Sequence, residues 1–121
     1  YACECVGSKV SFTITLKTMI QYTVTVTVPN ELAQKWETWM VEKHIDDVMA
    51  TGKFISAHLW KLQSPEDTTH TRFQTQYTAE SMEHYDDYRA NFAPELQAEH
   101  FAVFGTEVTA SREILESIKK W

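Results

Sequence analysis

Three side chains with complementary chemistry stand in the middle of the sequence: His58, Trp60 and Arg72. A histidine is a base near neutral pH, and an arginine can hold a carboxylate or stabilise an enolate. A tryptophan adds a flat aromatic wall. Together they would form a pocket for a small, flat, anionic metabolite, with His58 and Arg72 as candidate catalytic residues. The alternative is that all three pack against a partner subunit.

The patterning around these residues predicts neighbouring strands. Apolar and polar residues alternate over 20–28, and segments 54–62 and 71–79 also have strand character. Turn-forming residues at 64–67 separate the last two segments, which predicts a hairpin. Because successive side chains on a strand point to opposite faces, one face of the sheet collects a defined set: His58, Trp60, Arg72, Gln74, Gln76 and Thr25.

That predicted face is polar but almost free of charge, since hydroxyls and amides dominate it. A solvated sheet face usually carries lysine and glutamate, whereas this composition is typical of a surface covered by a second subunit or lining a cavity. We therefore expect a homodimer through this face. We also expect Trp60, Gln74, Gln76 and Thr25 to bind a small-molecule ligand there. A plain solvated sheet is the alternative, because threonine favours strands by propensity alone.

Two helical segments are predicted between the strands. The first begins at Asn30 as N-cap and ends near Gly52, and its apolar stripe shifts near His44, which predicts a bend. Along it Trp36, Trp39 and Met40 have the spacing of core residues. His44 lies where the helix dipole favours a cation, so a structural role is the first interpretation.

The second helical segment is predicted to begin at Ser81, to be interrupted by Pro94 and to end at Gly105. A fourth strand is predicted over 106–111, followed by a short terminal helix from Ile114. The order is then β-α-β-β-α-β. This is the ferredoxin-like α+β arrangement, with a four-stranded antiparallel sheet and both helices on one face.

Length and charge exclude several classes of protein. The chain has 121 residues, with 11 Lys plus Arg and 17 Asp plus Glu, for a formal net charge of -6. This length supports one domain. The acidic balance argues against nucleic-acid and membrane partners, which need clustered basic residues. Histidine spacings that bind zinc are missing, so we expect neither a metal site nor a cofactor.

The first eighteen residues differ in character from the rest. Both cysteines of the chain, Cys3 and Cys5, lie there, too close for an ordinary bridge, which favours a reducing compartment and a cytoplasmic location. Residues 1–18 are interpreted as an N-terminal extension, either upstream of a native start at Met19 or forming an extra strand. Residues 19–121 are interpreted as a single domain.

From Met19 onward the sequence resembles a family of short, uncharacterised bacterial proteins, classed as a domain of unknown function within the dimeric α+β-barrel superfamily. The resemblance covers about residues 19–118 and rests on several motifs: Met19-Ile20-x-Tyr22-x-Val24-x-Val26, Trp36-x-x-Trp39-Met40, His44-Ile45-x-x-Val48-Met49-Ala50-Thr51-Gly52-x-Phe54, Gln76-Tyr77, Phe92-Ala93-Pro94-x-Leu96 and Glu99-His100.

The resemblance implies a homodimer whose two sheets face each other to form a barrel. Superfamily relatives include cofactor-free monooxygenases and haem-degrading enzymes, but the family itself brings no activity. Because His44 belongs to the shared motifs, it is a second candidate catalytic residue, at the barrel mouth. His100 corresponds in kind to the helix histidine that binds haem in some relatives, although the strand asparagine that accompanies it there is missing.

Three hypotheses follow, and the sequence leaves open whether the protein is an enzyme. In the first, a homodimeric α+β barrel binds or transforms a small, flat, anionic metabolite without a cofactor. In the second, the chain is a structural dimerisation module without catalytic activity. In the third, it binds or degrades haem.

Overall fold

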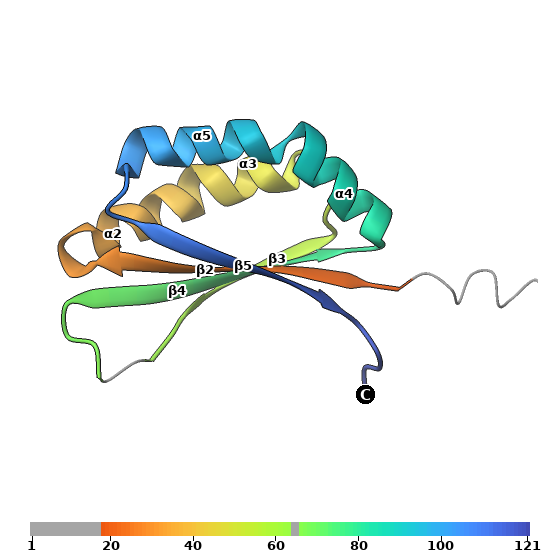
Figure 1. The fold of residues 1–121 in the computed structure, drawn as a ribbon, viewed down its shortest axis with the longest axis horizontal. Helices are drawn as coiled ribbons and strands as arrows, with labels where there is room; N and C mark the ends of the chain where they lie inside the picture. The colour runs from red at the N-terminus through yellow and green to blue at the C-terminus, as the bar shows by residue number, and fades with distance from the viewer. Residues whose placement is uncertain (1–17, 64–65) are drawn as a thin grey trace, which may run out of the picture.

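Every described helix lies on one face of a single four-stranded sheet (Figure 1). The structure is a computed structural model, and it describes residues 18–63 and 66–121. All but the last residue of the predicted N-terminal extension, 1–18, therefore lies outside the described residues. None of the helices in the described part of the chain has the length and apolar character needed to cross a bilayer.

The sheet has the predicted topology. Its strands are β2 (Ile20–Pro29), β3 (Ser56–Lys61), β4 (His70–Ala79) and β5 (Thr109–Glu116), in the spatial order β3-β4-β2-β5. All neighbouring strands are antiparallel. The sheet is not closed within one chain, so β3 and β5 are edge strands. These findings confirm the ferredoxin-like α+β fold.

The predicted terminal helix from Ile114 is wrong, because this segment is part of β5. The strand pairs with β2 along its length, with Glu116 opposite Ile20, and Ser117 N donates to Met19 O at 2.9 Å. The last apolar residues of the chain have helical spacing. The open edge of β2 nevertheless supplies backbone partners for the whole segment, and this non-local pairing decides its structure.

The first helical segment contains a π-helical insertion at the predicted bend. It consists of α2 (Asn30–Trp39), the π-helix η1 (Met40–His44) and α3 (Ile45–Met49), and Ile45 N donates to Met40 O across the insertion. The extra residue rotates the buried stripe, so Trp36 and Met40 pack on one part of the sheet and Val48 on another. Insertions of this kind are frequent at functional sites.

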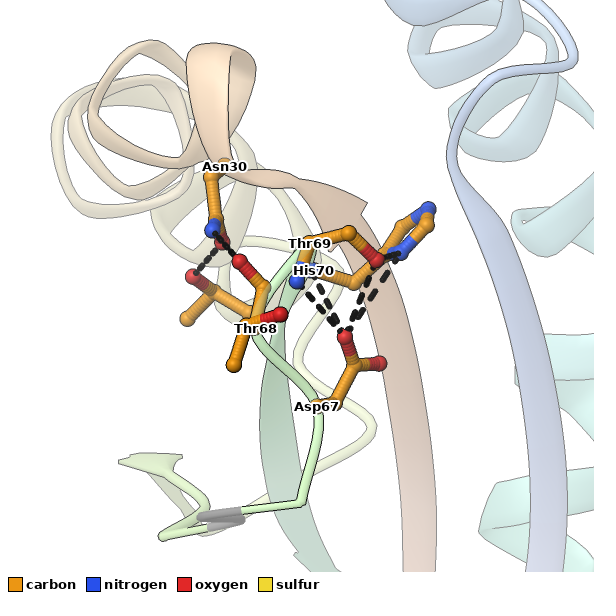
Figure 2. A network of polar contacts seen from close by, with 6 residues as sticks. Asn30, Asp67, Thr68, Thr69 and His70 are labelled. Atoms are coloured by element: carbon orange, nitrogen blue, oxygen red, sulfur yellow. Dashed lines mark hydrogen bonds and ion pairs between the residues drawn. The ribbon is translucent and has the colours of Figure 1, made fainter.

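Asn30 does not act as the predicted N-cap, because it is the first residue of α2 and no side chain caps that end. Its side chain instead holds the connection between β3 and β4 (Figure 2). Asn30 Nδ2 donates to Thr68 O at 2.9 Å, and Asn30 Oδ1 accepts from Thr71 Oγ1 at 2.8 Å. Asp67 Oδ1 accepts from the backbone N–H groups of Thr69 and His70, and these hydrogen bonds lower the pKa of the Asp67 carboxyl.

The second helical segment follows the sequence prediction closely. It comprises α4 (Met82–Asn91) and α5 (Ala93–Phe104), with Pro94 in the first turn of α5. Ser81 Oγ accepts from His84 N at 3.4 Å and caps α4, as predicted. Gly105 ends α5 with φ +64°, a conformation that glycine adopts readily.

The core between the helices and the sheet has two parts. One is built around stacked tyrosines and consists of Ile20, Tyr22, Val48, Phe54, Tyr77, Ala79, Tyr85, Tyr88 and Ala93. The other is built around Trp36 and consists of Val26, Val28, Trp36, Met40, Phe73, Phe104 and Val108. Trp36 and Met40 therefore belong to the core, as their spacing predicted.

Candidate functional site

A cavity of about 250 Å³ lies between the helices and the sheet, where the two parts of the core meet. Its walls are mostly apolar and aromatic, and its polar lining comes from both layers of the fold. The lining residues are Tyr22, Val24, Val26, Trp36, Met40, His44, Thr75, Tyr77, Tyr88, Leu96, Gln97, His100, Phe101, Gly105, Val108, Ala110 and Arg112. Concave, mostly apolar pockets with a few polar groups are the usual form of small-molecule sites.

His100 is held in this cavity by Trp36. Trp36 lies in α2 and is fully buried, and its Nε1–H donates to His100 Nε2, in α5, at 2.9 Å. Burial lowers the pKa of His100, and the nearby Arg112 guanidinium lowers it further. His100 is therefore neutral at pH 7. The sequence suggests His100 only as a haem ligand and does not predict its contact with Trp36.

His44 lies beside His100 at the end of the π-helical insertion. Its ring stacks on Trp39 with centroids 5.0 Å apart, and its centroid is 6.3 Å from that of His100. The pKa of His44 is lowered to about 4, mainly by burial of the imidazole and in the same direction by the neighbouring His100. Within the described residues, His44 Nδ1 is buried and has no hydrogen-bond partner.

Thr75 places a hydroxyl on the strand side of the cavity. It lies in the middle of β4 between Val24 on β2 and Leu59 on β3, and only 1% of its surface is exposed. Its Oγ1 has no hydrogen-bond partner among the described residues. Leaving a buried hydroxyl unsatisfied costs about 1–3 kcal/mol, so a cavity ligand that bonds to it would recover this energy.

Arg112 brings a positive charge to the sheet side of the cavity. It lies on β5, and its Nε donates to the hydroxyl of Tyr22 at 3.1 Å. One of the five N–H donors of the guanidinium is used in this way. The neighbouring tyrosines Tyr77 and Tyr88 are neutral, because burial raises the pKa of each phenol.

The face of the sheet that no described helix covers is called the open face. It carries the residues that the sequence predicted to lie together on one side of the sheet. His58 stacks on Trp60 with centroids 4.0 Å apart. Trp60 Nε1 donates to Gln76 Oε1 at 3.1 Å, and Gln76 Nε2 donates to Gln74 Oε1 at 2.8 Å. Gln74 Nε2 then donates to Thr25 Oγ1 at 3.2 Å. One hydrogen-bonded chain thus crosses three strands.

The predicted site residues therefore fall into two sets on opposite sides of the sheet. His44 lines the cavity, whereas the others occupy the open face, where Arg72 lies opposite Thr27, beyond the hydrogen-bonded chain. Arg112 was missed because the predicted fourth strand ended at residue 111. Thr75 could have been found, because it is a polar residue among the apolar helix-facing positions of β4.

In the ranges 18–63 and 66–121, no three side chains of His, Cys, Asp or Glu lie close enough together to hold a metal ion. The polar lining of the cavity consists of the Arg112 guanidinium, hydroxyl groups, the Gln97 amide and the two imidazoles.

Sequence comparison gives a match of residues 19–118 to the family described as domain of unknown function (DUF4286). No functionally curated protein matches the chain in sequence.

Solved structures share the fold at low sequence identity. A dimeric ferredoxin-like protein from an uncultured marine organism aligns with a TM-score of 0.66 at 5% identity, covering 87% of this chain and 100% of that one. The solution structure of a hypothetical Arabidopsis thaliana protein aligns with 0.55 at 17% identity, covering 86% and 94%. The de novo designed protein Foldit4 aligns with 0.54 at 8% identity, covering 84% and 99%. At such identities the likeness shows the fold alone.

Proposed function

Because the chain belongs to the DUF4286 family, whose description names no activity, we propose its function from the cavity. The protein binds a small, flat, anionic metabolite between its helices and its sheet, without a cofactor. The observation that supports this proposal is the convergence of Arg112, two neutral histidines and the unpartnered Thr75 hydroxyl on one apolar, aromatic cavity.

The size of the cavity limits the ligand. A volume of about 250 Å³ corresponds to roughly eight water molecules at about 30 Å³ each, which is less than the usual pocket for a drug-sized molecule. A single substituted ring fits this space. Flat faces of Trp36, Tyr22 and Phe101 suit an aromatic or conjugated body.

The charge of the ligand follows from Arg112. An arginine guanidinium binds most strongly to an anion that can accept several of its N–H donors, and Tyr77, Tyr88 and the two histidines of the cavity are neutral here. A carboxylate or an enolate meets this requirement. The low pKa of His44 makes it a weak base. We therefore propose binding of the ligand and not its conversion. Either histidine would accept a proton only from a ligand that raises the pKa of that histidine.

The test is a calorimetric and thermal-shift screen of small aromatic and dicarbonyl acids against the wild type, Arg112→Gln and Arg72→Gln. Loss of one charged hydrogen bond of about 1.5–3 kcal/mol predicts a fall in affinity of roughly 10- to 100-fold for Arg112→Gln. Arg72→Gln, on the open face, is the matched control and keeps wild-type affinity. If only Arg72→Gln loses binding, the site is instead the open-face set with His58 and Arg72. Failure of every acid to bind would refute both.

We also propose that two chains associate through the open face of the sheet. The low charge of this face and the hydrogen-bonded chain from Trp60 to Thr25 support the proposal, as does the dimeric state named for the marine ferredoxin-like protein. His58, Arg72 and Trp60 would then contact the partner subunit. Sedimentation of Trp60→Glu tests this, because a carboxylate buried in the interface would yield monomers.

This second proposal also supports a second candidate function, a structural dimerisation module. A stable wild-type dimer that binds none of the acids would favour it.

Haem binding, in contrast, fits these residues poorly. His100 is the histidine considered for the axial position, and its Nε2 already accepts a hydrogen bond from Trp36.

A further inference from the structure

The hydrogen bond from Trp36 to His100 determines which nitrogen of His100 carries a proton. An indole N–H is a donor only, so the nitrogen that it contacts must offer a lone pair. Trp36 Nε1 contacts His100 Nε2 at 2.9 Å. In a neutral imidazole the proton then resides on Nδ1, and this nitrogen is left as a donor.

Packing against both the sheet and the helices makes this arrangement rigid. Trp36 is fully buried and packs against Phe73 with ring centroids 4.7 Å apart, so its indole cannot turn away easily. The ring of His100 is also held by Phe104, at 5.1 Å, and by the edge contact with Trp39, at 5.6 Å. The choice of tautomer is therefore made by the fold before any ligand binds.

Hydrogen-bond donors outnumber dedicated acceptors among the other polar groups of the cavity. Arg112 can only donate, and Tyr22 already accepts from Arg112 Nε, so its own O–H is left as a donor. Thr75, His44 and the amide of Gln97 can donate or accept. Of the described residues that line the cavity, none is an aspartate or a glutamate.

We infer that Trp36 is a positioning residue that presents His100 Nδ1–H to the cavity and so makes the site selective for ligands whose polar atoms are hydrogen-bond acceptors. The inference rests on the proposed function and narrows it. Carbonyl and carboxylate oxygens on a flat ring are accepted, and ring amines are rejected, because a donor facing His100 Nδ1–H and Arg112 would lose its hydrogen bonds to water without replacement.

The experiment combines nitrogen-15 NMR of the imidazoles with binding of three matched probes: benzoate, acetophenone and aniline. In the wild type we expect His100 to give the spectrum of the Nδ1–H tautomer. We also expect both acceptors to bind more tightly than aniline. Trp36→Phe keeps the aromatic packing but removes the donor, so His100 becomes a mixture of tautomers and the preference for acetophenone over aniline falls about tenfold.

Two further variants keep the test decisive. Trp39→Phe is the matched control, because Trp39 touches the His100 ring without donating to it, and it should leave the tautomer and the preference unchanged. His100→Gln serves if Trp36→Phe does not fold, since a rotating amide can donate or accept and should also lose the preference. An Nε2–H signal for wild-type His100, or equal binding of acetophenone and aniline, would overturn this inference but not the proposed function. Absence of binding by all three probes would overturn it together with the proposed function.

Discussion

Lowering the pH from 7 to 5 should destabilise the protein through His44, because the folded protein holds this histidine in its neutral form. Its pKa is about 4 in the folded state and 6.5 in the unfolded chain. Between these values the unfolded chain binds a proton that the folded protein does not bind, so the free energy of unfolding falls as the pH falls. Stability is complete above pH 6.5 and is lost progressively towards pH 4.

The size of the effect follows from the two pKa values. Integrating proton binding from pH 7 to pH 5 gives a loss of about 2 kcal/mol for His44. Burial of the imidazole is the main cause of the low pKa, and the neighbouring His100 adds to it. His100, whose pKa is lowered as well, contributes in the same direction. Such a loss is a large part of the total stability of a small domain, which is about 5–15 kcal/mol.

Urea unfolding at pH 7 and at pH 5, followed by tryptophan fluorescence, measures this loss directly. The comparison is His44→Leu, which has a similar volume and cannot be protonated. The variant should match or exceed the wild type at pH 7, because the unpartnered Nδ1 is gone, and should lose about 2 kcal/mol less between the two pH values. His58→Gln, on the open face, is the control. An identical pH dependence in the wild type and His44→Leu would refute the reasoning.

Three further predictions concern stability. Thr75→Val removes a buried hydroxyl without a partner and keeps the shape of the side chain, so we expect urea unfolding to show a gain of about 1 kcal/mol, together with weaker benzoate binding; a loss of stability would contradict this. Ser81→Ala removes the acceptor that caps α4 and should cost about 1 kcal/mol in thermal unfolding, whereas an unchanged Tm would show that the cap is dispensable. Phe73→Ala opens a space beside Trp36 and should cost about 3–5 kcal/mol in urea, so a cost below about 1 kcal/mol would argue against this packing.

The sequence by itself determined which side chains share a face of each element. The alternation along β2 and β4 placed Thr25, Gln74 and Gln76 on one side of the sheet, and the structure joins them by hydrogen bonds. The sequence also predicted the interruption of the second helical segment at Pro94 and its end at Gly105. These features are local, because backbone geometry fixes the period of a strand or a helix and the residues that can end it.

Only the tertiary structure decided which elements meet and how far each one extends. The pairing of β5 with β2 carried the strand beyond residue 111 and brought Arg112 to the cavity, against the helical spacing of the last apolar residues. The packing of α5 on α2 joined His100 to Trp36, which lies 64 positions earlier in the chain. Such contacts depend on the shape and hydrogen-bonding capacity of distant segments, and no periodicity within either segment contains that information.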